Sequence, residues 1–186
     1  MKRHLVIRYL KLWNLGFCLV SGFEIIAFII LSFFIPITVN SQNYTLFSLL
    51  FFSGLSPVHM PLLWIFIFAS ICIHIVFAIL LLIIAYNEKI ENITYSRILL
   101  SIGFFFLIAN FLKMEAIYIL SKSTVDPSSS ALNFELLLYN SANTPFIGAV
   151  FWIYFTASVC VYLISGLVFA AIGLKWMLLL ENKQLT

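Results

Sequence analysis

Charged residues are scarce in this sequence, and their scarcity excludes most classes of water-soluble protein. Asp, Glu, Lys and Arg make up 9% of the 186 residues, whereas hydrophobic residues make up 63%. An ordinary soluble domain has about 25% charged and roughly 45–50% apolar residues. A soluble chain of this length would lack the charge needed to cover its own surface. We therefore expect an integral membrane protein that is in contact with the lipid bilayer.

Cysteine and histidine are also few, with three of each. The cysteines Cys18, Cys72 and Cys160 lie in apolar stretches and form no Cys-x-x-Cys pair, so we interpret them as packing residues rather than redox centres. The histidines are His4, His59 and His74. They lie at different levels of the membrane, which argues against a metal site and against a haem held by two histidines. A haem held by His74 and a non-histidine ligand is conceivable, but nothing in the sequence calls for one. The sequence therefore identifies no cofactor.

Motifs of soluble-type catalysis are missing as well. The chain has no P-loop, no dinucleotide fingerprint, no nucleophile elbow and no HExxH. The net charge of +3 comes from lysines and arginines near the ends of apolar stretches, which indicates membrane topology rather than a nucleic-acid partner. We expect no nucleic-acid binding, and a non-catalytic protein is the simpler interpretation.

Long apolar stretches are what the sequence has in abundance. Four of them cover about residues 12–36, 62–86, 98–120 and 149–174. Each exceeds the roughly 20 residues needed to cross about 30 Å of hydrocarbon. Period-2 alternation is absent, and a backbone in lipid must satisfy its own hydrogen bonds, so we predict helices rather than strands. The expected fold is all-α, with one transmembrane domain over residues 1–186 and four spans.

The positions of the cations predict the orientation of these spans. Lysines and arginines precede the first stretch, separate the second from the third and follow the fourth: Lys2, Arg3, Arg8, Lys11, Lys89, Arg97, Lys175 and Lys183. The positive-inside rule then places both termini in the cytoplasm and the loops 37–61 and 122–148 outside. The first stretch is too long for a signal peptide and no small-x-small cleavage site follows it, so we expect it to remain as a helix.

An internal repeat is the most informative pattern in the chain. The segment Trp64 to His74 aligns without a gap with Trp152 to Tyr162, and Trp, Ile, Ala, Ser and Cys are identical. Chance similarity between two apolar helices is the alternative, but it explains shared rare residues poorly. We predict a tandem duplication of a two-helix unit, with repeat 1 over about 8–90 and repeat 2 over about 97–180. The equivalent packing residues are Trp64, Ser70 and Cys72 in repeat 1 and Trp152, Ser158 and Cys160 in repeat 2.

Two spans per repeat predict a pseudo-symmetric four-helix bundle. Both repeats enter the membrane in the same direction, so we expect them to be related by an axis along the membrane normal. Ser56-Pro57 and Thr144-Pro145 share the offset of the repeat and predict N-cap and first-turn pairs at the second and fourth spans. The outer loops carry short apolar segments, Thr45 to Phe52 and Ala131 to Tyr139, which we expect to form interfacial helices or to cover the mouth of the bundle.

Polar residues are predicted to gather near the bilayer midplane. At about 1.5 Å per residue, the midpoints of the four spans fall near positions 24, 74, 109 and 162. The candidate residues are Glu24, His74, Asn110, Lys113, Glu115 and Tyr162. A charge at the bilayer centre costs about 2.5–3.5 kcal/mol, so such groups normally face the bundle interior and pair.

Three interpretations of this midplane cluster remain open. In the first, Glu24 and Lys113 form a buried ion pair that locks the first span against the third, with His74 and Tyr162 as core partners. In the second, Glu24 and His74 exchange a proton near neutral pH in an ion path or small-ligand site, and Lys113 sets the local field. In the third, one or more of these groups point outward to a polar group on another subunit.

No motif places the chain in a known family, and a four-helix architecture by itself does not imply a function. We expect a non-catalytic accessory or structural subunit of a larger membrane complex, whose partners are other membrane subunits or further copies of the chain. One alternative is a small transporter or channel that moves protons or ions through Glu24, His74 and Lys113. Another is a membrane-embedded enzyme or a quinone- or lipid-binding module, in which Tyr162, His74 and Glu24 hold a polar head group.

Overall fold

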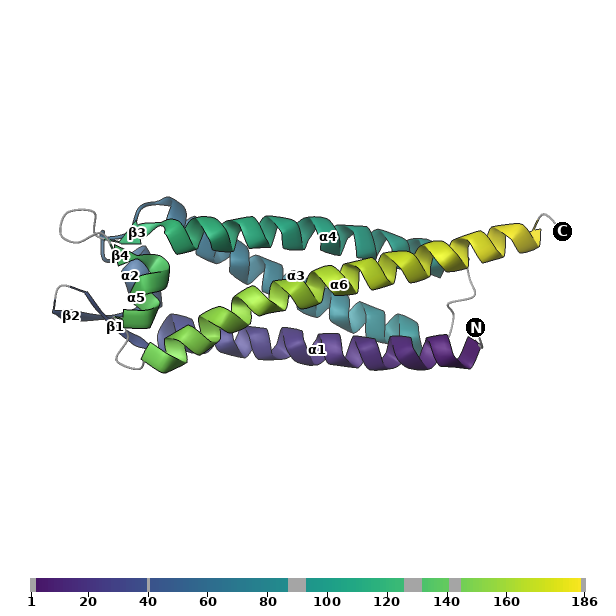
Figure 1. Ribbon diagram of the computed structural model, residues 1–186, viewed down its shortest axis with the longest axis horizontal. Coiled ribbons are helices and arrows are strands. Elements are labelled where there is room, and N and C mark those ends of the chain that lie inside the picture. The colour runs from purple at the N-terminus through teal and green to yellow at the C-terminus, as the bar shows by residue number, and fades with distance from the viewer. Residues whose placement is uncertain (1–2, 40, 87–92, 126–131, 141–144, 185–186) are drawn as a thin grey trace. The chain divides into compact units, whose positions relative to one another are not determined.

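Four long helices dominate the protein. The computed structural model describes residues 3–39, 41–86, 93–125, 132–140 and 145–184, and the structural statements below refer to these ranges. The long helices are α1 (Arg3–Phe33), α3 (His59–Tyr86), α4 (Ile93–Lys122) and α6 (Pro145–Gln184) (Figure 1). Each is long and apolar enough to cross a membrane. The predicted helices are therefore confirmed, except that the first ends at Phe33 rather than near residue 36.

Short elements connect α1 to α3 and α4 to α6. They are β1 (Pro36–Val39), β2 (Gln42–Thr45), α2 (Leu46–Phe51), β3 (Thr124–Val125), β4 (Leu132–Asn133) and α5 (Phe134–Asn140). The strands pair as two antiparallel hairpins, with Pro36 opposite Thr45 in the first and Thr124 opposite Asn133 in the second. These hairpins correct the all-α prediction, because strands this short give no period-2 signal. Helices α2 and α5 fall on the two apolar segments expected to be helical, although Ala131 lies outside the described residues.

Local signals explain where several helices begin. Thr45 forms a capping box with Ser48, which gives the six-residue helix α2 a defined start. Helix α6 begins at Pro145, as predicted, while its expected N-cap Thr144 lies outside the described residues. The matching prediction for α3 is wrong, because α3 begins at His59 and not at Pro57. The backbone N–H of Met60 instead donates to the Pro57 carbonyl at 3.0 Å, so Pro57 lies in a turn before the helix.

The chain forms two compact units, and each long helix contributes one segment to each. Unit 1 comprises Met1–Gly22, Cys72–Phe111 and Val159–Thr186, and unit 2 comprises Phe23–Ile71 and Leu112–Ser158. All four long helices supply the core of unit 1, which contains Leu10, Phe17, Ala78, Leu81, Leu99, Ile102, Phe106, Tyr162 and Phe169. In unit 2, the core includes Phe28, Trp64, Phe134, Trp152 and Phe155, and the hairpins and short helices gather at one end (Figure 1).

The order of elements occurs twice along the chain. A long helix, a hairpin, a short helix and a second long helix make up α1-β1-β2-α2-α3, and the same series makes up α4-β3-β4-α5-α6. The buried residues of α2 are Leu46, Leu49 and Leu50, and those of α5 are Phe134, Leu137 and Leu138. Each buried residue of α5 therefore lies 88 positions after one of α2, which is also the spacing of Trp64 and Trp152.

Candidate functional site

A buried ion pair lies in unit 2. Lys113 on α4 donates to the carboxylate of Glu24 on α1, and both side chains are 0% exposed. The hydroxyl of Ser158 on α6 lies 2.6 Å from Glu24 Oε1 and 2.8 Å from the Phe155 carbonyl, so it donates to one or the other. A buried charge is tolerated only when it is paired and hydrogen-bonded. The Glu24 carboxylate thus joins α1, α4 and α6.

A buried aromatic group that includes a histidine lies in unit 1. His74 on α3 stacks on Tyr162 of α6, with ring centroids 4.0 Å apart and an interplanar angle of 21°. Phe17 packs against Tyr162 at 5.2 Å and Phe106 against His74 at 5.6 Å. The Tyr162 hydroxyl donates to Ser21 Oγ at 3.3 Å. Stacked and edge-to-face rings of this kind add to the stability that burial alone provides.

Two asparagines are also buried in unit 1. The Asn110 amide donates to the Phe106 carbonyl at 2.8 Å, and the Asn14 amide donates to the Leu81 carbonyl at 3.0 Å. Within the described ranges, neither Oδ1 atom has a hydrogen-bond partner. Sequence reasoning missed Asn14, because depth arithmetic considered only residues near the span midpoints. The signal that could have identified Asn14 was its polarity within an apolar stretch. Its amide connects α1 to α3 through the Leu81 carbonyl.

The structure brings the predicted polar residues together in pairs. Glu24 and Lys113 meet in unit 2, His74 and Tyr162 meet in unit 1, and Asn110 is buried in unit 1. Glu115 is exposed on α4, where it contrasts with the buried Lys113 two positions earlier. A cluster of all six residues remains a prediction. So does proton exchange between Glu24 and His74, which belong to different units.

The predicted repeat residues show matching contacts in α3 and α6. Trp64 and Trp152 are each 2% exposed, and their rings lie 6.1 and 5.4 Å from the ring of Phe134. Ser70 and Ser158 are buried, and each hydroxyl lies 2.7–2.8 Å from the carbonyl three residues earlier. The cysteines differ, since Cys72 is half-buried and Cys160 is exposed. The tryptophans and the serines are thus buried alike, although Ser158 also meets the Glu24 carboxylate.

A second correspondence relates α1 to α4, and sequence reasoning missed it. Every buried residue of α1 from Leu10 to Ser32 is matched by a buried residue 89 positions later on α4. The pairs are Leu10 and Leu99, Asn14 and Gly103, Phe17 and Phe106, Ser21 and Asn110, Glu24 and Lys113, Ala27 and Ala116, Phe28 and Ile117, Leu31 and Leu120, and Ser32 and Ser121. Four of the five identical pairs are common apolar residues, and the spacing differs by one from that of α3 and α6. For both reasons the correspondence between α1 and α4 is hard to recognise in the sequence.

Several matching residues touch each other. The rings of Phe17 and Phe106 lie 5.1 Å apart, and Glu24 pairs with Lys113, which is also its counterpart at the 89-residue spacing. His74 stacks on Tyr162, its counterpart at the 88-residue spacing.

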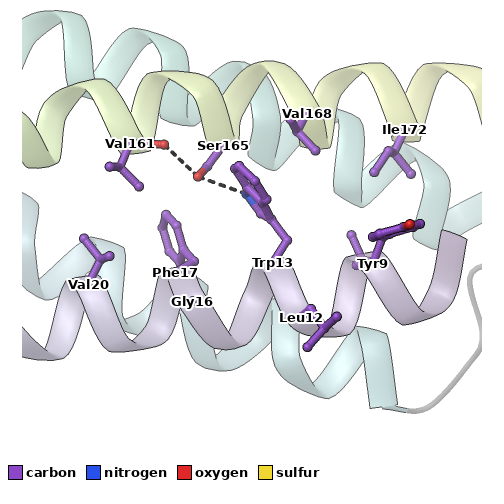
Figure 2. Close-up of a pocket in the computed structure, with 11 residues that line it drawn as sticks. Tyr9, Leu12, Trp13, Gly16, Phe17, Val20, Val161, Ser165, Val168 and Ile172 are labelled. Carbon is purple, nitrogen blue, oxygen red and sulfur yellow. Dashed lines mark hydrogen bonds between the residues drawn. The ribbon is translucent and has the colours of Figure 1, made fainter. Parts of the chain in front are cut away.

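Two apolar grooves lie apart from these polar groups. A groove of about 410 Å³ lies between α1 and α6 in unit 1, and Figure 2 shows Trp13 of α1 reaching toward Ser165 of α6 within it. A second, of about 290 Å³, is lined by Phe, Ile and Trp side chains of unit 2. Neither groove includes Glu24, His74 or Lys113. Within the described part of the chain, no three His, Cys, Asp or Glu side chains are placed to hold a metal ion.

The fold and these sites define a mostly helical chain with four helices of membrane-spanning length and apolar composition. Comparisons with protein-family models, with curated proteins and with solved structures find no match to this chain.

Proposed function

We propose that this chain is a non-catalytic integral membrane protein that serves as a structural subunit of a larger membrane complex. Glu24 and Lys113 satisfy each other and meet the Ser158 hydroxyl, and neither lines either groove. A buried pair of this kind holds three helices in one arrangement, which is a structural role. The absence of catalytic motifs and the short loops agree with it.

The exposed surface supports a place in the bilayer. Large apolar side chains are exposed along all four long helices, for example Leu19, Phe23, Ile65, Ile79, Phe104, Phe111, Ile153 and Leu167. Exposed apolar area on this scale is incompatible with water but matches lipid tails. The positive-inside rule favours a cytoplasmic location for both termini, because eight of the ten lysines and arginines flank the spans on the side of the termini, whereas Lys122 lies at the opposite end of α4. Labelling of single cysteines placed near residues 5 and 42 tests this orientation.

We further propose that the four spans arose by tandem duplication. The repeated order of elements supports it, and so do the matching spacings of three separate segments. A constant spacing of 88 covers α2 with α5 and α3 with α6, and a spacing of 89 covers α1 with α4. Contacts between equivalent residues, such as Phe17 with Phe106, favour a two-fold axis, which in a membrane would lie along the normal.

The proposed contact with a partner subunit rests on the exposure of Glu115. This residue lies on α4, seven residues before the helix ends at Lys122 and therefore about 10 Å along the helix axis from that end. A carboxylate exposed to lipid at such a depth is costly, and its side chain is too short to reach the interface easily. A polar or basic group on a neighbouring subunit would remove this cost. The third interpretation of the polar residues, contact with a partner, therefore applies to Glu115.

Blue-native electrophoresis in a mild detergent tests the partnership. We expect the wild-type chain to migrate well above its own 21.3 kDa, together with its partner. Glu115→Gln should release the lone chain, because the amide gives up the charge that the partner recognises. Glu135→Gln is the matched control, because Glu135 lies on α5 outside the long helices, and it should leave the complex intact. A wild-type protein found only as the lone chain would contradict the proposal.

A further inference from the structure

The groove between α1 and α6 has an apolar lining and a satisfied polar floor. The indole N–H of Trp13 donates to Ser165 Oγ at 3.2 Å, and the Ser165 hydroxyl donates to the Val161 carbonyl at 2.7 Å (Figure 2). The polar atoms of Trp13 and Ser165 are thus already paired, and most of what remains for a ligand is a hydrocarbon surface. Its volume of about 410 Å³ lies within the roughly 300–1,000 Å³ of ligand pockets.

The proposed duplication explains why this groove is open. Gly16 on α1 and Ser165 on α6 correspond to Phe105 on α4 and Phe77 on α3, at the spacings of 89 and 88 residues. The rings of Phe77 and Phe105 pack against each other, with centroids 5.1 Å apart. Two phenylalanines therefore occupy the α3–α4 position where the α1–α6 position has a glycine and a serine. The groove is a specific departure from the symmetry and not a general gap between helices.

The length of the groove matches one leaflet of a bilayer. On α1 its lining runs from Tyr9 to Val20, which is roughly 16 Å at 1.5 Å per residue. The hydrocarbon of a bilayer is about 30 Å thick, so the groove covers half of it. A partner helix would cross the whole thickness with about 20 residues, so the groove would cover only about half of its length. A lipid acyl chain from a single leaflet fits the groove better.

Two cations continue the walls of the groove at one end. Arg8 lies one turn before Leu12 on α1, and Lys175 follows Val168 and Ile172 at helical spacing on α6. Both Arg8 and Lys175 are exposed. Figure 2 shows Tyr9 and Ile172 together at this end of the groove. A negatively charged head group would find complementary charge there, whereas the opposite end at Val20 and Val161 is apolar.

We infer that this groove binds one acyl chain of an anionic phospholipid from the leaflet on the side of the termini, with the head-group phosphate between Arg8 and Lys175. The inference rests on the proposed membrane insertion and duplication. Gly16 and Ser165 leave room for the chain, Trp13 and Phe17 form the floor, and the two cations select the head group. The bound lipid takes the place of the missing pair of phenylalanines.

Native mass spectrometry of the detergent-solubilised protein, titrated with phosphatidylglycerol or phosphatidylcholine, tests the inference. Gly16→Phe restores the residue type found at Phe105, and a Cβ at Gly16 meets nothing within 4 Å. Gly22→Phe is the matched control, because its Cβ also meets nothing within 4 Å and Gly22 does not line the groove. We expect the wild type and Gly22→Phe to retain phosphatidylglycerol and Gly16→Phe to lose it. Arg8→Gln and Lys175→Gln should each lower the preference for phosphatidylglycerol over phosphatidylcholine about fivefold.

Two results from the Gly16→Phe variant would overturn the inference. One is unchanged lipid retention in Gly16→Phe. The other is a stoichiometric protein partner that Gly16→Phe displaces, which would assign the groove to a helix. Alkaline carbonate extraction of the membranes separates this failure from failure of the proposed function. A wild type that stays in the membrane but retains no phosphatidylglycerol contradicts only the lipid site, whereas a wild type that leaves the membrane contradicts both. Circular dichroism checks that the variants keep the helical fold.

Discussion

Glu24 and Lys113 occupy matching positions, 89 residues apart on α1 and α4, and form a buried ion pair with each other. Under the proposed duplication these positions would meet across a two-fold axis, where two identical charges would repel each other in a buried site. We propose that the opposite charges let the two halves of the chain recognise each other rather than themselves.

Breaking the ion pair at one side should destabilise the protein strongly. Glu24→Leu or Lys113→Leu leaves a buried charge without its partner, and we expect a loss of about 3–5 kcal/mol in the free energy of unfolding. The double variant Glu24→Leu with Lys113→Leu should recover most of this loss, because no charge then remains to be desolvated. Unfolding of the purified protein in detergent measures these differences. Single variants as stable as the wild type would show that the pair does not hold the helices.

Separated halves of the chain should assemble with each other. We expect a tagged fragment of residues 1–90 to co-purify with a co-expressed fragment of residues 91–186, because Phe17 packs on Phe106 and Glu24 pairs with Lys113. Glu24→Lys should weaken co-purification by placing two lysines together, and the further change Lys113→Glu should restore it. If the swapped pair does not restore assembly, the charge pairing is not what makes the two halves recognise each other.

Close contacts at glycine predict where added volume is tolerated. A Cβ at Gly103 on α4 would lie 2.4 Å from the backbone nitrogen of Ala170 on α6, whereas a Cβ at Gly16 meets nothing within 4 Å. Gly103→Ala should therefore destabilise the protein by about 1–3 kcal/mol through overpacking. Gly16→Ala should stabilise it by roughly 0.5–1 kcal/mol, since alanine favours the helix. Thermal unfolding in detergent distinguishes the two, and equal effects would contradict the α4–α6 contact.

Tyr139 on α5 should give the protein an alkaline dependence of stability. Partial burial raises the pKa of its hydroxyl, and the negative charge of Glu135 and hydrogen bonding to it raise that pKa further. The folded state thus holds the proton more tightly than the unfolded chain. This stability is present in full below the ordinary tyrosine pKa of about 10 and is lost as the pH rises through the raised value.

Ultraviolet titration of tyrosinate, as the difference between wild type and Tyr139→Phe, measures this pKa directly. Glu135→Gln should lower the pKa but leave it above the ordinary value, because the larger cause, burial, remains. Tyr139→Phe should also reduce the loss of stability at alkaline pH. A Tyr139 that titrates at the same pH with and without Glu135 would contradict the role of that carboxylate.

Much of the architecture followed from local and solvent physics. The lengths of the four apolar stretches predicted the long helices, since hydrocarbon leaves few other choices for the backbone. The short apolar segments that form α2 and α5 were also predicted, because their apolar composition stands out within the outer loops. Both Trp64 and Trp152 are buried near Phe134, whereas the duplication inferred from their shared register stays a prediction. The two hairpins were not predicted, because strands of two to four residues depend on their partners and not on their own pattern.

The sequence by itself determined the number and length of the apolar helices and the polar residues available within them, because length and hydrophobicity are properties of each segment alone. Which of those residues meet was decided only by the tertiary structure. It paired Glu24 with Lys113, stacked His74 on Tyr162 and left Glu115 on the surface. Depth along a helix can be counted from the sequence, but the direction of a side chain depends on how the helices pack, and that is a property of the whole fold.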